Sequence, residues 1–170
     1  IVEALTANEE LSVICRLYVL TESDGRYKAQ RLLTVLGNGA VFNKPVSRFS
    51  RGMRQSVLIS ASLVHKPELL FWDEPLNGLD ANTVLIIEEV LAKLRYQGNT
   101  IFYSSHILDV VQAVCDQILL LNDGRVAAQG AFADLSHTSD TSLQQLFNDM
   151  TGFKEHGEKA QAIIDVLGVS

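Results

Sequence analysis

Residues 69–80 read Leu69-Leu70-Phe71-Trp72-Asp73-Glu74-Pro75-Leu76-Asn77-Gly78-Leu79-Asp80, and their character changes from apolar to acidic without a spacer. The four large apolar residues predict a strand buried on both faces, as in a parallel sheet, with Phe71 and Trp72 in the core. Pro75 ends the strand because it lacks the N–H that a sheet requires, and Gly78 allows the chain to turn. The stretch therefore predicts an acidic pair at the carboxyl edge of a parallel α/β sheet, where such folds bind ligands.

The acidic pair itself, Asp73 and Glu74, is suited to phosphate chemistry. One carboxylate can hold a hydrated Mg²⁺, and the other can orient a water molecule. Taken alone, two acids after an apolar strand are more often just the end of that strand. The surrounding motifs have to decide between these two interpretations.

The composition is that of a soluble globular protein, with 170 residues, 47% hydrophobic and 20% charged. A formal net charge of -6 and the lack of a basic run argue against a nucleic-acid partner. Cys15 and Cys115 lie far apart in apolar patterns, which favours buried, reduced thiols and gives no metal-ligand spacing. No segment approaches the ~20 apolar residues of a membrane span, so a partner would have to cross any membrane involved.

The first 48 residues predict a small helical lobe. Residues 6–9, Thr-Ala-Asn-Glu, fit a capping box that opens a helix up to about Leu20. Residues 21–25 look like a polar break, and a second helix is expected from about Arg26 to Leu36, ending at residues 37–39, Gly-Asn-Gly. We therefore assign residues 1–48 to a helical lobe.

The middle of the chain predicts a strand–helix–strand unit. Ser50 caps one helix, the acidic strand follows, and a helix from about Ala81 to Gln97 ends at Gly98. Residues 100–103 form a second apolar strand, which ends in Ser-Ser-His at 104–106. Short connections make this a βαβ unit with parallel strands, which brings His106 to the same sheet edge as the acids.

The rest of the chain predicts a short helix at 108–114, then a hairpin and a tail. Strands at 117–121 and 126–130 flank residues 122–125, Asn-Asp-Gly-Arg, whose Asp-Gly is typical of a hairpin turn. The fold class is thus α/β, with a parallel sheet and flanking helices. A helical lobe (1–48), a catalytic core (49–130) and a helical tail (131–170) are its three expected segments.

Four motifs in this order resemble the ATP-binding cassette (ABC) family, over about Leu5 to Gly130. They are Ser-Arg-Gly-Met-Arg-Gln at 50–55 opening a helix, the acidic strand, Asn-Gly-Leu-Asp at 77–80, and Ser-His at 105–106. Each motif is weak alone, but their order and spacing together are specific. The resemblance is to the exporter-type ATP-binding subunits of ABC transporters, and it implies a partial P-loop NTPase-like parallel sheet.

The resemblance implies a role for each matching residue. Ser50, Arg51 and Gly52 look like the signature segment, in which Ser50 and Gly52 reach the γ-phosphate of ATP held by the opposite subunit. A hydroxyl and free N–H groups at a helix start suit an anion. Asn77 to Asp80 resembles the loop that crosses the dimer interface and helps to bind nucleotide.

The catalytic roles fall on the sheet edge. Asp73 resembles the Mg²⁺ carboxylate, Glu74 the carboxylate that positions the attacking water, and His106 the switch histidine that touches the γ-phosphate. On its own, His106 would more often be a structural or surface imidazole. The implied cofactors are ATP and Mg²⁺.

The chain departs from the family pattern in three positions and one motif. Arg51 and Met53 replace the usual Gly and Gln, and Arg51 either adds charge near the nucleotide or points to solvent. Ser56 replaces an Arg, which leaves the packing below the signature helix open. The P-loop, Gly-x-x-x-x-Gly-Lys-Ser/Thr, is absent from these residues. We expect a C-terminal part of a cassette, which alone binds ATP poorly and hardly hydrolyses it.

Three functions remain open. The first is an ATP-hydrolysing subunit of an efflux-type ABC transporter, which dimerises around ATP beneath a membrane permease, at the cytoplasmic face of the membrane. The second is a non-transport ABC ATPase, which the lack of a tandem cassette or a heptad run disfavours. The third is a non-enzymatic partner or remnant cassette, which the missing P-loop supports and the intact acids and His106 oppose.

Overall fold

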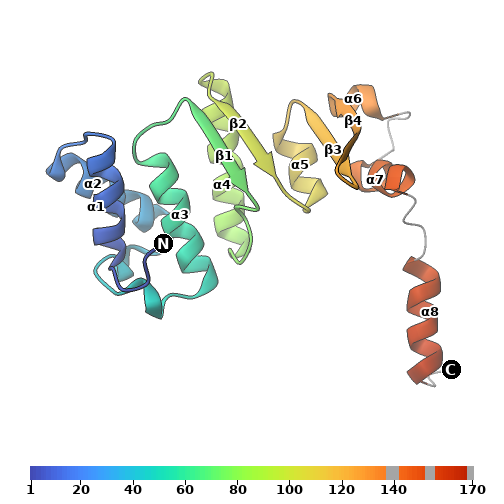
Figure 1. The fold of residues 1–170 in the computed structure, drawn as a ribbon, viewed down its shortest axis with the longest axis horizontal. Helices are drawn as coiled ribbons and strands as arrows, with labels where there is room; N and C mark the ends of the chain where they lie inside the picture. The colour runs from blue at the N-terminus through green and yellow to red at the C-terminus, as the bar shows by residue number, and fades with distance from the viewer. Residues whose placement is uncertain (137–141, 152–155, 168–170) are drawn as a thin grey trace. The chain divides into compact units, whose positions relative to one another are not determined.

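The computed structural model describes residues 1–136, 142–151 and 156–167. Its backbone contacts divide the chain into two compact units, Ile1–His106 and Ile107–Ser170. All the residues predicted to form the functional site belong to the first unit. The fold of each unit is described separately below, with the elements labelled as in Figure 1.

The first unit begins with a helical lobe, as predicted. It contains α1 (Ala7–Leu17), α2 (Glu22–Val35) and two short 3-10 turns, η1 (Gly39–Val41) and η2 (Val46–Arg48). The predicted capping box is present, since the Thr6 hydroxyl accepts from the N–H of Glu9 and the Glu9 carboxylate accepts from the N–H of Thr6. This box fixes the start of α1 at the expected residue.

The predicted break at residues 21–25 is wrong, because this segment is the first turn of α2. Thr21 is the N-cap, and its hydroxyl accepts from the N–H of Asp24 at 3.3 Å. A polar Thr-x-x-Asp segment looks like a loop in a hydrophobicity pattern, but it is also what a helix start requires. The end of α2 is as predicted, with Gly37 in the left-handed region at φ +76°.

The lobe shares one apolar core with the next helix, α3 (Arg51–Leu63). Leu11 of α1, Leu33 of α2 and Val57 of α3 are fully buried together in this core. The apolar core of the lobe therefore extends beyond residue 48 into α3. The helix that starts with Ser50 is packed onto it.

The predicted βαβ unit follows, with β1 (Leu69–Asp73), α4 (Ala81–Tyr96) and β2 (Thr100–Ser104). The two strands are parallel, as predicted, in a register that pairs Asp73 with Ser104. Gly98 ends the helix with φ +91°. Figure 1 shows β1 and β2 side by side, with their carboxyl ends at the same edge of the sheet.

The prediction that β1 is buried on both faces is wrong for these residues. Leu70 and Trp72 are buried, but Leu69 is 49% exposed and Phe71 is 70% exposed. Trp72 is covered by α3, where its Nε1 donates to the Ser62 hydroxyl at 2.9 Å. On the other face, Phe71 stacks on Phe102 of β2 with ring centroids 4.9 Å apart, and both rings remain open to solvent. Phe71 is therefore not a core residue here, and β2 is not the buried strand that its sequence predicts.

The second unit contains α5 (Leu108–Val114), the hairpin β3 (Ile118–Asn122) and β4 (Arg125–Gly130), and the helices α6 (Phe132–Leu135), α7 (Leu143–Thr151) and α8 (His156–Leu167). The hairpin is antiparallel, as predicted, and its turn residues Asp123 and Gly124 both have positive φ. Within the predicted tail, residues 137–141, 152–155 and 168–170 lie outside the described residues. Across the described ranges, no helix has the length and apolarity needed to cross a membrane.

Candidate functional site

Glu74 marks the point where β1 ends and the candidate site begins. Its N–H still donates to the carbonyl of Ser104 at 3.0 Å, so the pairing with β2 continues to this residue. Its φ of +48° is in the left-handed region, which non-glycine residues rarely adopt. Such outliers occur where the surrounding structure holds a functional or turning residue in place.

The Glu74 carboxylate is held by the segment that follows β2. Its Oε1 accepts from the backbone N–H of His106 at 2.9 Å and lies 2.8 Å from the ring Nδ1 of the same residue. The Ser105 hydroxyl donates to Oε2 at 3.5 Å. The structure thus brings the predicted catalytic pair together at one sheet edge, as the parallel topology requires.

The pair has the chemistry of a proton-handling site. The Glu74 side chain is 32% exposed, and the His106 side chain is 70% exposed. The carboxylate orients the imidazole through Nδ1, while most of the ring remains accessible to a ligand. A carboxylate and an imidazole in this contact can position a water molecule and touch an anionic group beside it.

Asp73, the predicted metal ligand, lies next to this pair. The Ser104 hydroxyl donates to Asp73 Oδ1, which orients the carboxylate at the rim of the sheet. No cluster of three or more His, Cys, Asp or Glu side chains suited to a metal ion occurs among the described residues. Mg²⁺ in phosphate sites is held by one or two carboxylates, by water and by substrate phosphates, so a single oriented carboxylate fits it.

The predicted signature segment opens α3. The Ser50 hydroxyl accepts from the N–H of Met53 at 3.2 Å, so it caps the helix and keeps its own hydrogen to donate. Gly52 lies tightly against the loop after β1, because a Cβ at this position would lie 2.3 Å from the carbonyl oxygen of Gly78. Arg51 is exposed, and its aliphatic stem lies over Gly78. The stem packs on the loop, while the charge is free to face solvent.

The loop of Asn77 to Asp80 follows the acidic pair in the sequence, and its Gly78 contacts Arg51 and Gly52 of the signature segment. The Asn77 N–H donates to the Glu74 carbonyl at 3.3 Å, and Gly78 has φ +81°. Asp80 caps α4, where its carboxylate accepts from the Thr83 hydroxyl at 2.6 Å and from the Thr83 N–H at 3.1 Å. These two bonds from Thr83 lower the pKa of Asp80. A helix cap accounts for this carboxylate within the chain.

The predicted residues therefore form two groups in the structure. Asp73, Glu74 and His106 gather at the rim of the sheet, while Arg51 and Gly52 pack against Gly78 at the start of α3. The sequence predicts Ser104 only as part of a strand end and Ser105 only as part of the Ser-His motif, and neither hydroxyl is predicted to bond to an acid. The strand register pairs Ser104 with Asp73, and Ser105 follows as the next residue, so parallel pairing is the signal that brings these hydroxyls to the acids.

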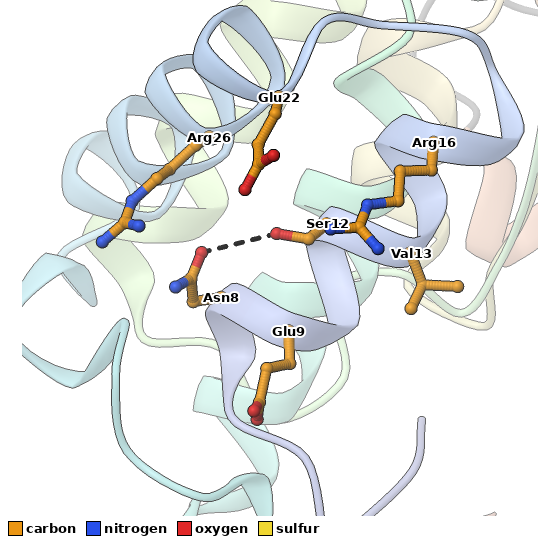
Figure 2. Close-up of a pocket in the computed structure, with 7 residues that line it drawn as sticks. All are labelled: Asn8, Glu9, Ser12, Val13, Arg16, Glu22 and Arg26. Carbon is orange, nitrogen blue, oxygen red and sulfur yellow. Dashed lines mark hydrogen bonds between the residues drawn. The ribbon is translucent and has the colours of Figure 1, made fainter.

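A pocket of about 290 Å³ lies elsewhere, on the helical lobe between α1 and α2. Figure 2 shows its lining, in which the Ser12 hydroxyl donates to the Asn8 side chain at 3.5 Å. Two acids and two bases lie around it, Glu9, Glu22, Arg16 and Arg26. Its charges balance, so it favours neither an anion nor a cation, and none of the predicted site residues lines it.

Known proteins are similar to this chain in sequence and in fold. A family model described as ABC transporter matches residues 2–77. NatA, an ABC transporter ATP-binding protein of Bacillus subtilis (strain 168), is 36% identical over 133 residues, which cover 78% of this chain and 54% of NatA. The linearmycin resistance ATP-binding protein LnrL of the same organism is 35% identical over 142 residues, 82% of this chain and 46% of LnrL.

The fold is also found in a solved structure of the ATP binding subunit of an ABC transporter, with a TM-score of 0.81 and 29% identity. That match covers 89% of this chain and 64% of the other. The chain spans about half the length of the two curated relatives. The order of motifs, the parallel strands and these matches agree, and the chain belongs to the ABC transporter ATP-binding family.

Proposed function

We propose that this chain provides the carboxylate and switch-histidine part of an ATP-hydrolysing subunit that powers an efflux-type ABC transporter. The supporting observation is the Glu74 carboxylate, which contacts both the backbone N–H and the ring of His106 at the rim of a parallel sheet. In this proposal residues 1–48 are the helical lobe, 49–130 the catalytic core and 131–170 the tail.

Glu74 would position the water that attacks the γ-phosphate, because its carboxylate is an oriented acceptor at the edge where parallel α/β sheets bind ligands. His106 would contact the γ-phosphate with the exposed part of its ring, while Nδ1 stays against Glu74. Two groups held by one hydrogen-bond network reach the reacting atoms in a fixed geometry. That preorganisation is where most of the catalytic effect in phosphoryl transfer arises.

Asp73 would hold Mg²⁺, which neutralises developing charge on the phosphates when bound. The Ser104 hydroxyl fixes the direction of this carboxylate, and Glu74 is left for the water because Ser105 and His106 hold it. The two neighbouring acids therefore have different partners and different proposed roles.

Ser50, Arg51 and Gly52 would face ATP held by a second ABC subunit, together with Asn77 and Asp80 at the dimer interface. The first turn of α3 offers backbone N–H groups and the Ser50 hydroxyl to an anion. Dimer closure around ATP would draw the helical lobes together and move a membrane permease. Efflux is supported by the resistance-type relative, LnrL.

A second function is favoured by one observation. These 170 residues contain no Gly-x-x-x-x-Gly-Lys-Ser/Thr segment, the backbone cradle that grips the phosphates. A non-enzymatic chain could offer its Ser50 segment to a complete cassette without hydrolysing ATP itself. ATP turnover of this sequence joined to a P-loop separates the two, because both proposals expect the chain alone to bind ATP weakly but only the first expects turnover once a P-loop is supplied.

The decisive variant is Glu74→Gln, measured in an ATPase that contains this sequence and a P-loop. We expect ATP turnover to fall by a factor of about 10² to 10⁴, the usual contribution of one general base or water-positioning group. ATP binding should persist, so the ATP-bound dimer should accumulate on a sizing column.

The matched control is Glu68→Gln. Glu68 is an exposed residue of the same type at the opposite end of β1, and its backbone carbonyl, not its side chain, pairs with Thr100. It should leave turnover unchanged. Near-normal turnover of Glu74→Gln would remove Glu74 from the catalytic role.

A further inference from the structure

Ser56 is a buried polar residue one turn into α3, directly below the proposed signature segment. The residue is 1% exposed. The Ser56 hydroxyl donates to the Gly52 carbonyl at 3.0 Å and accepts from Asn38 Nδ2 at 2.9 Å. This hydroxyl therefore links the loop after α2 to the residue that packs against Gly78.

The direction of these bonds is fixed by chemistry. The Leu36 carbonyl, 2.9 Å from Asn38 Nδ2, can only accept, so the amide nitrogen must face it. The same nitrogen uses its other hydrogen on the Ser56 oxygen. The single hydroxyl hydrogen of Ser56 is then left for the Gly52 carbonyl. Each of these three hydrogens therefore has one acceptor.

Asn38 is itself held rigidly at the end of α2. Its N–H donates to the Leu33 carbonyl at 2.7 Å, and the N–H of Gly37 donates to the Thr34 carbonyl at 3.0 Å. This pair of bonds, with Gly37 at φ +76°, is a Schellman motif. A side chain that starts from such a fixed backbone position can set the position of whatever it bonds.

We infer that Asn38 and Ser56 are positioning residues for the segment Ser50–Gly52, and that they hold the first turn of α3 against the loop that follows Glu74. The inference rests on the proposed function, because it assigns the positioned segment to nucleotide contact. The lobe supplies Asn38, Ser56 transfers its position to Gly52, and Gly52 touches Gly78 with no space for a Cβ. A buried polar network of this kind fixes one geometry because any other leaves polar groups unpaired.

The first experiment needs no nucleotide and uses the chain itself. Amide hydrogen exchange is measured at Met53 and Arg54, the residues of the first turn that bond to Ser50. Ser56→Ala should speed this exchange about fivefold, the loss expected for one net hydrogen bond. Asn38→Asp keeps the size of the side chain, but it cannot donate to Leu36, so it should draw the Ser56 hydrogen away from Gly52 and give a similar increase.

The matched control is Ser60→Ala, one turn further along α3. Ser60 is fully buried, and its hydroxyl donates to the Ser56 carbonyl at 2.8 Å, so it makes the same kind of bond without a link to the lobe. It should leave exchange at Met53 and Arg54 unchanged. The double variant Asn38→Asp/Ser56→Ala should exceed neither single variant by much, because the two changes break one network.

The second experiment uses an ATPase that contains this sequence and a P-loop. Ser56→Ala and Asn38→Asp should raise the ATP concentration for half-maximal turnover while kcat changes less, and Ser60→Ala should do neither. Unchanged exchange in both single variants, or an equal increase in Ser60→Ala, would overturn the inference. Faster exchange with unaltered ATP dependence would confirm the positioning and count against the proposed nucleotide role of the segment.

Discussion

The helical lobe and the β1–β2 sheet are stabilised in different ways, although they belong to one compact unit. In the lobe, large side chains such as Leu11 and Leu33 are fully buried in a core shared with α3. In the sheet, one face is covered and the other exposes the stacked rings of Phe71 and Phe102. The lobe buries its apolar side chains in a core shared with α3, whereas the sheet buries the apolar side chains of only one face.

The difference separates the two groups of site residues. The Ser50 segment is positioned by the packed lobe, through α3 and the Asn38–Ser56 bond. The acids at the sheet rim are positioned by hydrogen bonds between strand ends, from Ser104 to Asp73 and from His106 to Glu74. Changes in the lobe core should therefore affect folding, and changes at the rim should affect chemistry.

The largest effect is expected from Leu33→Ala, which tests whether the lobe core carries the stability of the unit. Removing a fully buried leucine side chain leaves a cavity and should lower the free energy of unfolding by about 2–5 kcal/mol. Chemical denaturation followed by circular dichroism measures this loss.

The control for that prediction is Leu58→Ala on α3, where the leucine is 46% exposed. It should change the free energy of unfolding by less than about 1 kcal/mol. Equal losses in the two variants would mean that the lobe core is not the source of stability.

An intermediate effect is expected at the helix caps, where the two regions should behave alike. Threonine bonds lower the pKa of Glu9 at the start of α1 and of Asp80 at the start of α4. A carboxyl with a lowered pKa stabilises the fold above its unfolded-state pKa, and that stability is lost as the pH falls through the folded-state value. Thr83→Val removes the hydroxyl that bonds to Asp80, so the pKa of Asp80 should rise. The stability that this carboxyl contributes should then be smaller, and its loss on acidification should be complete at a higher pH.

Carboxyl NMR titration reads each cap separately. Glu9 is the internal control, since it bonds to Thr6 and should titrate as before in Thr83→Val. An unchanged pKa of Asp80 would show that the Thr83 hydroxyl is not the group that stabilises this carboxylate.

The smallest effect on stability is expected from Phe71→Ser, which tests the open face of the sheet. Because Phe71 is 70% exposed, its loss should cost the chain no more than the value of one aromatic stack, about 1 kcal/mol. Self-association of the chain should decrease, since an exposed apolar sheet face favours aggregation. Sedimentation over a range of concentrations measures this, and a loss of stability as large as that of Leu33→Ala would show that the face is covered.

The elements that the sequence predicts well are those with local chemical signals. The Thr6–Glu9 box, the Ser50 cap and Gly98 mark helix ends through bonds between near neighbours. The parallel pairing of β1 and β2 follows from the helix that connects them. From this pairing alone, the sequence predicts that His106 and Glu74 lie at the same edge of the sheet, where they are in contact. These predictions needed only local and topological rules.

The features that the sequence could not give depend on contacts between distant residues. Which face of β1 is covered depends on where α3 packs, so the exposure of Phe71 has no local signal. The bond between Asn38 and Ser56 joins residues 18 positions apart, and the sequence shows only that Ser56 replaces the usual arginine. The start of α2 is ambiguous in the sequence for a different reason, since Thr21 and Asp24 suit a loop and a helix cap equally.

The two apolar faces of β1 have a consequence for strand alignment. If the register of β1 shifted by one residue, Leu69 and Phe71 would take the buried places of Leu70 and Trp72. Apolar side chains would then still be buried on the covered face. Hydrophobic burial therefore distinguishes poorly between the correct and the shifted alignment. Two polar contacts distinguish them: the Trp72 indole nitrogen donates to the Ser62 hydroxyl of α3, and the Ser104 hydroxyl donates to the Asp73 carboxylate. The Asp73 carboxylate, which is proposed to hold Mg²⁺, would therefore also favour the correct alignment of the strand.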